Sequence, residues 1–272
     1  SRPSLILDNT YISDQGMAHQ ENLTKMVDLQ LNDTDVGDDG LAHLSGMNNL
    51  QFLSLKNTFI TDKGLEQLRD LKLLSRVYLN NTDVTDKGMP VFEGFPQLNA
   101  ALLSGTQITD AGLEPFGRLP EIEYLWLSNV RITDAGLKHL RDAESLPALE
   151  LSGTTISDAG LETLAVLPGV NRFYANNTQV TDAGLQHIRG WRKLQHLYLT
   201  NTAISDVGLE SISGLTELQA LMIGSTLVND AGLAHLRGLT KLSRLQLEKT
   251  LIGDAGLEHL RDLKTLNHLG LE

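Results

Sequence analysis

The sequence contains no cysteine, few aromatic residues and no long apolar run. The absence of cysteine excludes disulfide-bonded end caps and a thiol nucleophile. Without an apolar stretch of about 20 residues, we expect no membrane insertion. The 22 lysine and arginine residues are spread along the chain, whereas a nucleic-acid surface needs a clustered basic footprint. We therefore expect no nucleic-acid partner.

The formal net charge of −12 has an architectural origin. Eleven of the 34 acidic residues are aspartates that recur at one position of a sequence repeat, and the remaining acids nearly balance the 22 basic residues. The acidity by itself therefore does not predict a cationic partner.

A 24-residue period runs through the whole chain. Its marker is Asp-x-Gly, which ends at Gly16, Gly40, Gly64, Gly88, Gly112, Gly136, Gly160, Gly184, Gly208, Gly232 and Gly256. Such a period predicts a solenoid, in which each unit buries its apolar face against the next. We interpret residues 1–272 as a single domain of eleven repeats plus a final strand. Because the chain starts within a repeat without Met, we expect it to be part of a longer protein.

Each repeat combines two apolar patterns. One unit reads Leu50-x-x-Leu53-x-Leu55-x-x-Thr58-x-Ile60-Thr61-Asp62-x-Gly64-Leu65-x-x-Leu68-x-x-Leu71. The alternation around Leu53 predicts a short strand with one buried face. The three-residue spacing that follows Thr61-Asp62 predicts a short helix with Thr61 as its N-cap and Asp62 next to the positive end of the helix dipole. Each unit is therefore expected to be a strand, a turn and a helix.

This pattern resembles the leucine-rich repeat family over its full length. It is closest to the bacterial form, with threonine in place of the usual asparagine and the second half I-[ST]-D-x-G-L-x-x-L, which is also similar to the repeats attached to F-box proteins. The resemblance implies an α/β solenoid: a right-handed horseshoe with a parallel β-sheet on its concave face and short helices on its convex face. It also suggests F-box-type substrate reception, although the chain contains no F-box segment.

Three further columns carry structural expectations. The threonine column, which only Val130 interrupts, is expected to bond backbone groups of neighbouring coils. The glycine column indicates a close backbone approach or a positive φ. Pro90 and Pro115 fall within two predicted helices, which we expect to be irregular.

The candidate site lies on the strands, at the positions twelve, ten and eight residues before each glycine. These positions hold six of the 13 aromatic residues, often beside a basic residue, and this combination is typical of binding hot spots. Small residues on the strands at Ala100-x-Leu102 and Ala148-x-Glu150 predict grooves between the aromatic ridges. We call the predicted partner-binding residues the concave strip; they are Arg76, Tyr78, Tyr124, Trp126, Glu150, Arg172, Tyr174, His196, Tyr198, Met222 and Arg244.

No combination of residues predicts catalysis. The strip lacks a nucleophile beside a base, and its acid Glu150 lies two coils from His196. The aspartates and the histidines that follow the glycines each lie on separate coils, so no metal site is predicted. We expect no cofactor and no enzymatic activity.

The strip predicts a scaffold that recognises a protein or peptide. Three alternatives stay open: an assembly module that self-associates through uncapped solenoid ends, a carbohydrate or cell-surface adhesion module, and a strip without any ligand, because tyrosine and tryptophan also favour strands.

Overall fold

The computed structural model describes residues 3–20, 23–143, 145–167 and 169–271. These residues fall into two compact units. The first contains the described residues of 1–131 and 142–145, and the second those of 132–141 and 146–272. The single continuous domain expected from the repeat stays a prediction.

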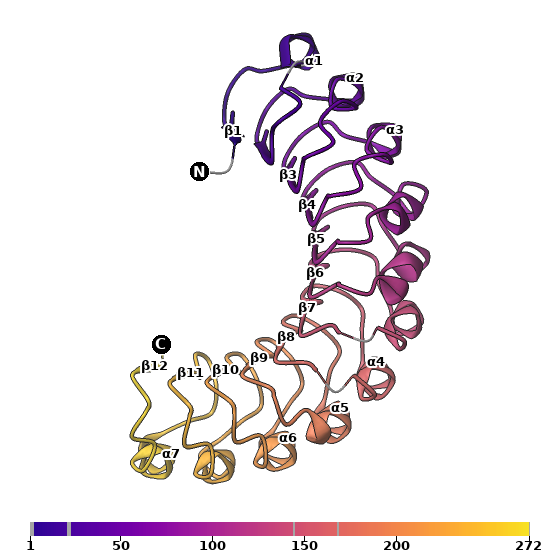
Figure 1. The fold of residues 1–272 in the computed structure, drawn as a ribbon. Coiled ribbons are helices and arrows are strands. Elements are labelled where there is room, and N and C mark those ends of the chain that lie inside the picture. Colours follow the sequence, from indigo (N-terminus) through magenta and orange to yellow (C-terminus); the bar gives the residue numbers. More distant parts are fainter. Residues whose placement is uncertain (1–2, 21–22, 144, 168, 272) are drawn as a thin grey trace. The chain divides into compact units, whose positions relative to one another are not determined.

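The first unit alternates strands with short helices (Figure 1). Its strands are β1 (Ser4–Ile6), β2 (Asp28–Gln30), β3 (Phe52–Ser54), β4 (Arg76–Tyr78), β5 (Ala100–Leu102) and β6 (Tyr124–Trp126). Its helices are α1 (Asp14–Met17), η1 (Ala18–Gln20), α2 (Asp38–Ala42), α3 (Asp62–Glu66), η2 (Met89–Gly94) and η3 (Asp110–Arg118), where η marks a 3₁₀ helix.

The second unit repeats this order. Its strands are β7 (Ala148–Glu150), β8 (Arg172–Tyr174), β9 (His196–Tyr198), β10 (Ala220–Met222), β11 (Arg244–Gln246) and β12 (His268–Gly270). Its helices are η4 (Gly136–Leu140), α4 (Asp158–Leu164), α5 (Asp182–His187), η5 (Ile188–Gly190), α6 (Asp206–Ile212), η6 (Gly232–Leu236), α7 (Asp254–Leu257) and η7 (Glu258–Leu260).

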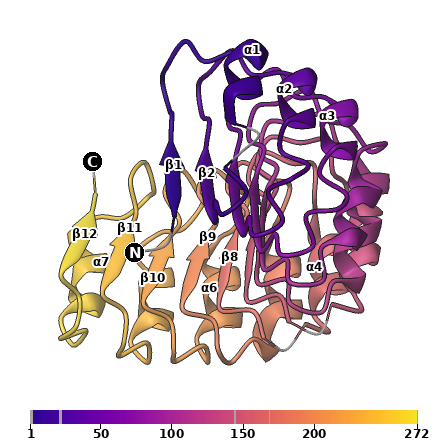
Figure 2. The ribbon, with the colours of Figure 1, turned by 45° about the horizontal axis from the view of Figure 1, so that its top comes forward.

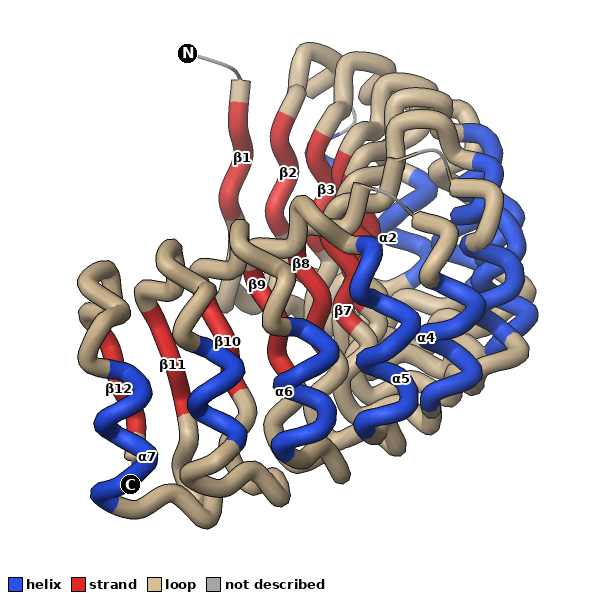
Figure 3. Tube along the Cα trace, turned by 90° about the horizontal axis from the view of Figure 1, so that it is seen from below, coloured by secondary structure: helices blue, strands red, loops and turns tan. Residues whose placement is uncertain are grey.

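In each unit the strands form a parallel sheet in chain order, and each residue pairs with the one 24 positions later. Leu29 pairs with Leu53 in the first unit and Leu221 with Leu245 in the second. Within each unit the helices lie on the opposite side from the strands (Figures 1 and 2), and loops join the two layers (Figure 3). The predicted α/β solenoid is confirmed.

The apolar columns form the core between these layers. The core includes two strand leucines, Leu29 and Leu53, the helix leucine Leu65, and Leu68 in the turn after α3, all fully buried. Phe173 and Ala175 are both buried, and the Phe173 ring meets the Trp191 ring at 5.2 Å, edge to face. Both spacings read from the sequence are thus explained by burial.

The predicted helix cap at Thr61 and the predicted irregular helices at Pro90 and Pro115 are both observed. The Thr61 side chain caps α3 by accepting a hydrogen bond from the Lys63 backbone N–H at 3.3 Å. The segments that contain Pro90 and Pro115 are 3₁₀ helices rather than α-helices. Since η4 and η6 are also 3₁₀ without containing a proline, proline is one cause of this geometry and not the sole one.

The expectation for the threonine column was wrong. Each hydroxyl donates within its own coil, to the carbonyl three residues earlier: Thr58 to Leu55 at 2.6 Å and Thr106 to Leu103 at 2.7 Å. The hydroxyl therefore closes the turn that leaves the strand. It does not join neighbouring coils.

The aspartate column joins the coils instead. Asp62 accepts from the Thr85 backbone N–H at 2.8 Å and from the Thr85 hydroxyl at 2.7 Å. We call these contacts the aspartate ladder; in the two units its described rungs run from Asp14 to Gly37, Asp38 to Thr61, Asp62 to Thr85, Asp86 to Thr109, Asp134 to Ser157, Asp158 to Thr181, Asp182 to Ser205, Asp206 to Asn229 and Asp230 to Gly253. Seven of these nine partner residues are the N-cap of the next helix, so the carboxylate bonds a helix start there. Thr85 and Asn229 instead lie shortly before η2 and η6.

The repeat glycines make room for this ladder. A Cβ added to Gly88 would lie 2.7 Å from Asp62 Oδ1 and 2.8 Å from Leu65 Cδ1. Gly88 has a φ of −79°, so close approach, and not backbone conformation, requires glycine here.

A column of residues in the left-handed backbone conformation, which was not predicted from the sequence, precedes the threonines. Asn57 and Asn81 have φ values of 55° and 56°. The Asn81 amide donates to Asn57 Oδ1 at 2.8 Å, across one coil. Asparagine tolerates this region better than most residues, which explains its recurrence at the turn.

Candidate functional site

In the first unit, two ridges of the concave strip enclose a groove. Arg76 and Tyr78 lie on β4, and Tyr124 and Trp126 lie on β6. The strand between them, β5, carries only Ala100 and Leu102 on this face, and Ala100 is 4% exposed. A groove of about 750 Å³ results, lined by these side chains and by four polar residues.

The aromatic side chains of the groove hold one another in place. Phe52 and Tyr78 meet edge to face at 4.8 Å, and Arg76 lies 4.7 Å above the Phe52 ring. On the other ridge, the Tyr124 and Trp126 rings are 5.8 Å apart. All of these side chains are partly exposed. The groove is therefore bounded by side chains that already make ring contacts before any partner binds.

A polar rim, which the sequence analysis missed, borders the groove. It consists of Gln51, Ser75, Asn99 and Glu123, each at the residue before a strand. Their backbone groups bond from coil to coil, with Ser75 N to Gln51 O, Asn99 N to Ser75 O and Glu123 N to Asn99 O all at 2.8 Å. The rim could have been predicted from the sequence, because its four residues each stand thirteen residues before a repeat glycine and are all polar.

In the second unit the strip forms a separate cluster on β8 and β9. Tyr174 and Tyr198 meet edge to face at 4.6 Å, and His196 lies 6.5 Å from the Tyr198 ring. Burial raises the pKa of Tyr174, and the neighbouring Tyr198 adds to this effect. Glu150 accepts from the Ser152 backbone N–H at 2.7 Å.

Met222 was expected on the surface as a partner-binding residue, but it is buried. It is 5% exposed, while Arg244 on the next strand is exposed. Ala148 and Ala220 stand twelve residues before a repeat glycine, as Arg244 does, and they are also buried. Met222 is flanked in the sheet register by Tyr198 and Gln246. Alternation alone therefore overstates the available surface.

Replacing His196 by glutamine is expected to flatten the dependence of stability on pH below about 6.5. Burial, together with the charges of Arg172 and Arg244, lowers the pKa of His196 from its ordinary value of 6.5. As the pH falls, the unfolded chain therefore binds this proton before the folded chain does, and the folded state loses stability until its own lower pKa is passed. Urea midpoints of both proteins between about pH 7.5 and pH 5 measure the effect. An unchanged pH slope in His196→Gln would contradict it.

The described residues contain neither a cluster of metal-ligating side chains nor a membrane-spanning helix. No group of three or more His, Asp or Glu side chains is placed to hold a metal ion there. No helix in the same part of the chain is long and apolar enough to span a membrane.

Comparison with known proteins agrees with this architecture. The leucine-rich repeat family profile matches residues 144–165 and 192–213. No curated protein gives a significant sequence match.

Solved structures with the same fold span most of the chain. An internalin (inlF) from Listeria monocytogenes is 20% identical, with a TM-score of 0.66, over 99% of this chain and 86% of its own. Internalin C2 from the same organism is 25% identical, with a TM-score of 0.60, over 78% and 84%. The plant peptide hormone receptor RGFR1, in complex with RGF2, is 15% identical, with a TM-score of 0.62, over 99% of this chain but 47% of the receptor. The chain thus spans less than half of that receptor.

Proposed function

We propose that this chain, a leucine-rich repeat protein, is a binding scaffold that recognises a protein or peptide on its strand face. The observation that carries the proposal is the groove over β4–β6, with aromatic walls, an alanine and leucine floor and a polar rim. Ligand grooves combine apolar surface with a few placed polar groups in this way. Side chains already fixed by ring contacts lose little conformational entropy when a partner binds.

Structural relatives support a peptide or protein as the partner. The plant receptor RGFR1 was solved with RGF2, and the Arabidopsis thaliana receptor kinase GASSHO1/SCHENGEN3 ectodomain was solved with Casparian Strip Integrity Factor 2. Carried over to this chain, these complexes favour a peptide or protein partner over a sugar. The alternative is that the tyrosines and Trp126 bind sugars by stacking their rings against the sugar rings.

The cluster around Tyr174 and Tyr198 provides a second contact area within the other unit. Its rings are positioned by each other, and Arg172 precedes Tyr174 on the same strand face. Arginine beside tyrosine is frequent among residues that dominate binding energy. We assign to this cluster a contact of its own with the partner.

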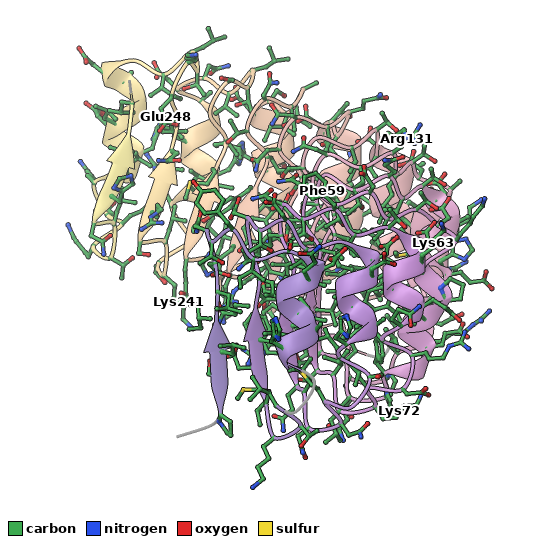
Figure 4. The ribbon with its side chains drawn as sticks, turned by 90° about the horizontal axis from the view of Figure 1, so that it is seen from above. Phe59, Lys63, Lys72, Arg131, Lys241 and Glu248 are labelled. Atoms are coloured by element: carbon green, nitrogen blue, oxygen red, sulfur yellow. The ribbon has the colours of Figure 1, made fainter. Side chains whose placement is uncertain are left out.

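Truncating an aromatic anchor is expected to weaken binding by about 2 kcal/mol without unfolding the chain. A peptide is first selected by panning the chain against a random dodecapeptide display library, and its affinity for Trp126→Ala and Tyr174→Ala is then measured by calorimetry. Phe59→Ala serves as the matched control, because Phe59 is an aromatic residue outside the strip that is 65% exposed (Figure 4).

Two results would count against this function. One is a peptide whose affinity is the same for both strip variants as for the Phe59→Ala control. The other is a library that yields no enriched sequence while a glycan array does, which would favour carbohydrate adhesion.

A further inference from the structure

Two cations on the β3–β4 side of the groove have aromatic rather than acidic neighbours. The Lys56 Nζ lies 4.9 Å from the centre of the Tyr78 ring, and Arg76 lies 4.7 Å above Phe52. Within the described residues, neither side chain forms an ion pair. In contrast, Arg118 and Lys241 each pair with glutamates.

The sheet register explains why the Arg76 charge is uncompensated. The strand neighbours of Arg76 are Phe52 on one side and Ala100 on the other, and neither carries a charge. In a chain of net charge −12, this is a local positive site above an aromatic pair. A guanidinium that is stacked on a ring keeps its edge donors available for a carboxylate.

The opposite side of the groove has the opposite sign. Glu123 lies on the rim next to Tyr124, and its side chain is exposed. An acidic group bound there would be repelled, whereas the same group beside Arg76 and Lys56 would be attracted. The groove is therefore positively charged on its β3–β4 side and negatively charged on its β6 side.

We call the apolar floor of the groove, formed by Ala100 and Leu102 on β5, the apolar seat. It lies one to two strands from the cations, and Trp126 and Tyr78 flank Leu102 in the sheet register. Neighbouring strands are about 4.8 Å apart, so the seat is roughly 5–10 Å from the β3–β4 side chains. In an extended peptide, residues i and i+2 lie on one side and about 6.8 Å apart, which fits this separation.

We propose that the groove over β4–β6 binds an extended acidic–apolar peptide segment. An aspartate or glutamate meets Arg76 and Lys56, and a large apolar side chain two residues away occupies the seat on Ala100 and Leu102. This inference rests on the proposed peptide-binding function and specifies the partner's chemistry.

The test is a selection followed by charge variants. The whole chain is panned against the random dodecapeptide library, and the enriched sequences are expected to carry Asp or Glu two positions from Trp, Phe or Leu. A synthetic peptide of that sequence should bind Arg76→Gln and Lys56→Gln about tenfold more weakly than the wild type. Its affinity for the wild type should fall as NaCl is raised from about 50 mM to about 500 mM.

Two controls accompany these variants. Lys63→Gln removes the same charge from the exposed start of α3 (Figure 4) and should leave affinity unchanged. A peptide in which lysine replaces the acidic residue should lose binding to the wild type. Circular dichroism confirms that each variant is folded.

The outcomes separate this inference from the function on which it rests. Peptides that lack the acidic residue, or that bind Arg76→Gln and Lys56→Gln as tightly as Lys63→Gln yet lose affinity for Trp126→Ala, overturn the inference and leave peptide binding intact. A library without any enriched sequence overturns both.

Discussion

Replacing Asp62 by alanine is expected to destabilise the folded chain by about 3 kcal/mol. The Asp62 carboxylate accepts two hydrogen bonds from Thr85, at 2.8 Å from the backbone N–H and at 2.7 Å from the hydroxyl. Hydrogen bonds to a charged acceptor contribute about 1.5–3 kcal/mol each, and the loss of both leaves a partly buried N–H without its acceptor. Asp62→Asn keeps an acceptor oxygen without the charge and should cost less.

The free energy of unfolding is obtained from urea titrations of the variants. Asp254→Ala is the matched control, because Asp254 occupies the same repeat position but its side chain is exposed and bonds no described residue. It should change stability by less than about 0.5 kcal/mol. Equal losses in Asp62→Ala and Asp254→Ala would show that the carboxylates act only on their own helices and that the aspartate ladder adds nothing.

Gly88→Ala is expected to destabilise the chain by about 3 kcal/mol, against the usual preference of helical segments for alanine. The new methyl group would lie 2.7 Å from Asp62 Oδ1 and 2.8 Å from Leu65 Cδ1. The Asp62 carboxylate cannot move aside without giving up its bonds to Thr85. The substitution therefore combines overpacking with the loss of one rung.

This reason predicts that the two changes are not additive. In Asp62→Ala/Gly88→Ala the methyl group enters space that the carboxylate has vacated, so the double variant should lose clearly less stability than the sum of the single variants. Gly190→Ala is the control, since a Cβ there would meet nothing within 4 Å. Strict additivity, or an equal loss in Gly190→Ala, would contradict the steric explanation.

The repeat predicted the coil correctly wherever burial decides the residue type. Leu53 and Leu65 mark a strand and a helix because each must face the core, and both are buried. The role of Asp62 could not be seen in the same way. A carboxylate at a helix start suits the helix dipole equally well, and only coordinates show that the next coil's Thr85 lies within bonding distance.

The candidate site was predictable in part for the same reason. The spacing of Tyr78, Ala100 and Trp126 on successive strands indicated ridges with a gap, and the groove lies there. The burial of Met222 was not predictable, because it depends on neighbouring side chains rather than on the column. The uncompensated charge of Arg76 also emerged only when its strand neighbours were known.

The aspartate ladder favours folding of each unit in the order in which its coils are synthesised. Each carboxylate of the ladder accepts from a backbone N–H 23 residues later in the chain, so a coil that has formed carries the acceptor for its successor. A ribosome delivers the chain in that same order. We therefore expect each newly synthesised coil to find its acceptor already formed, and strand pairing over such short sequence separations to be faster than pairing between distant strands.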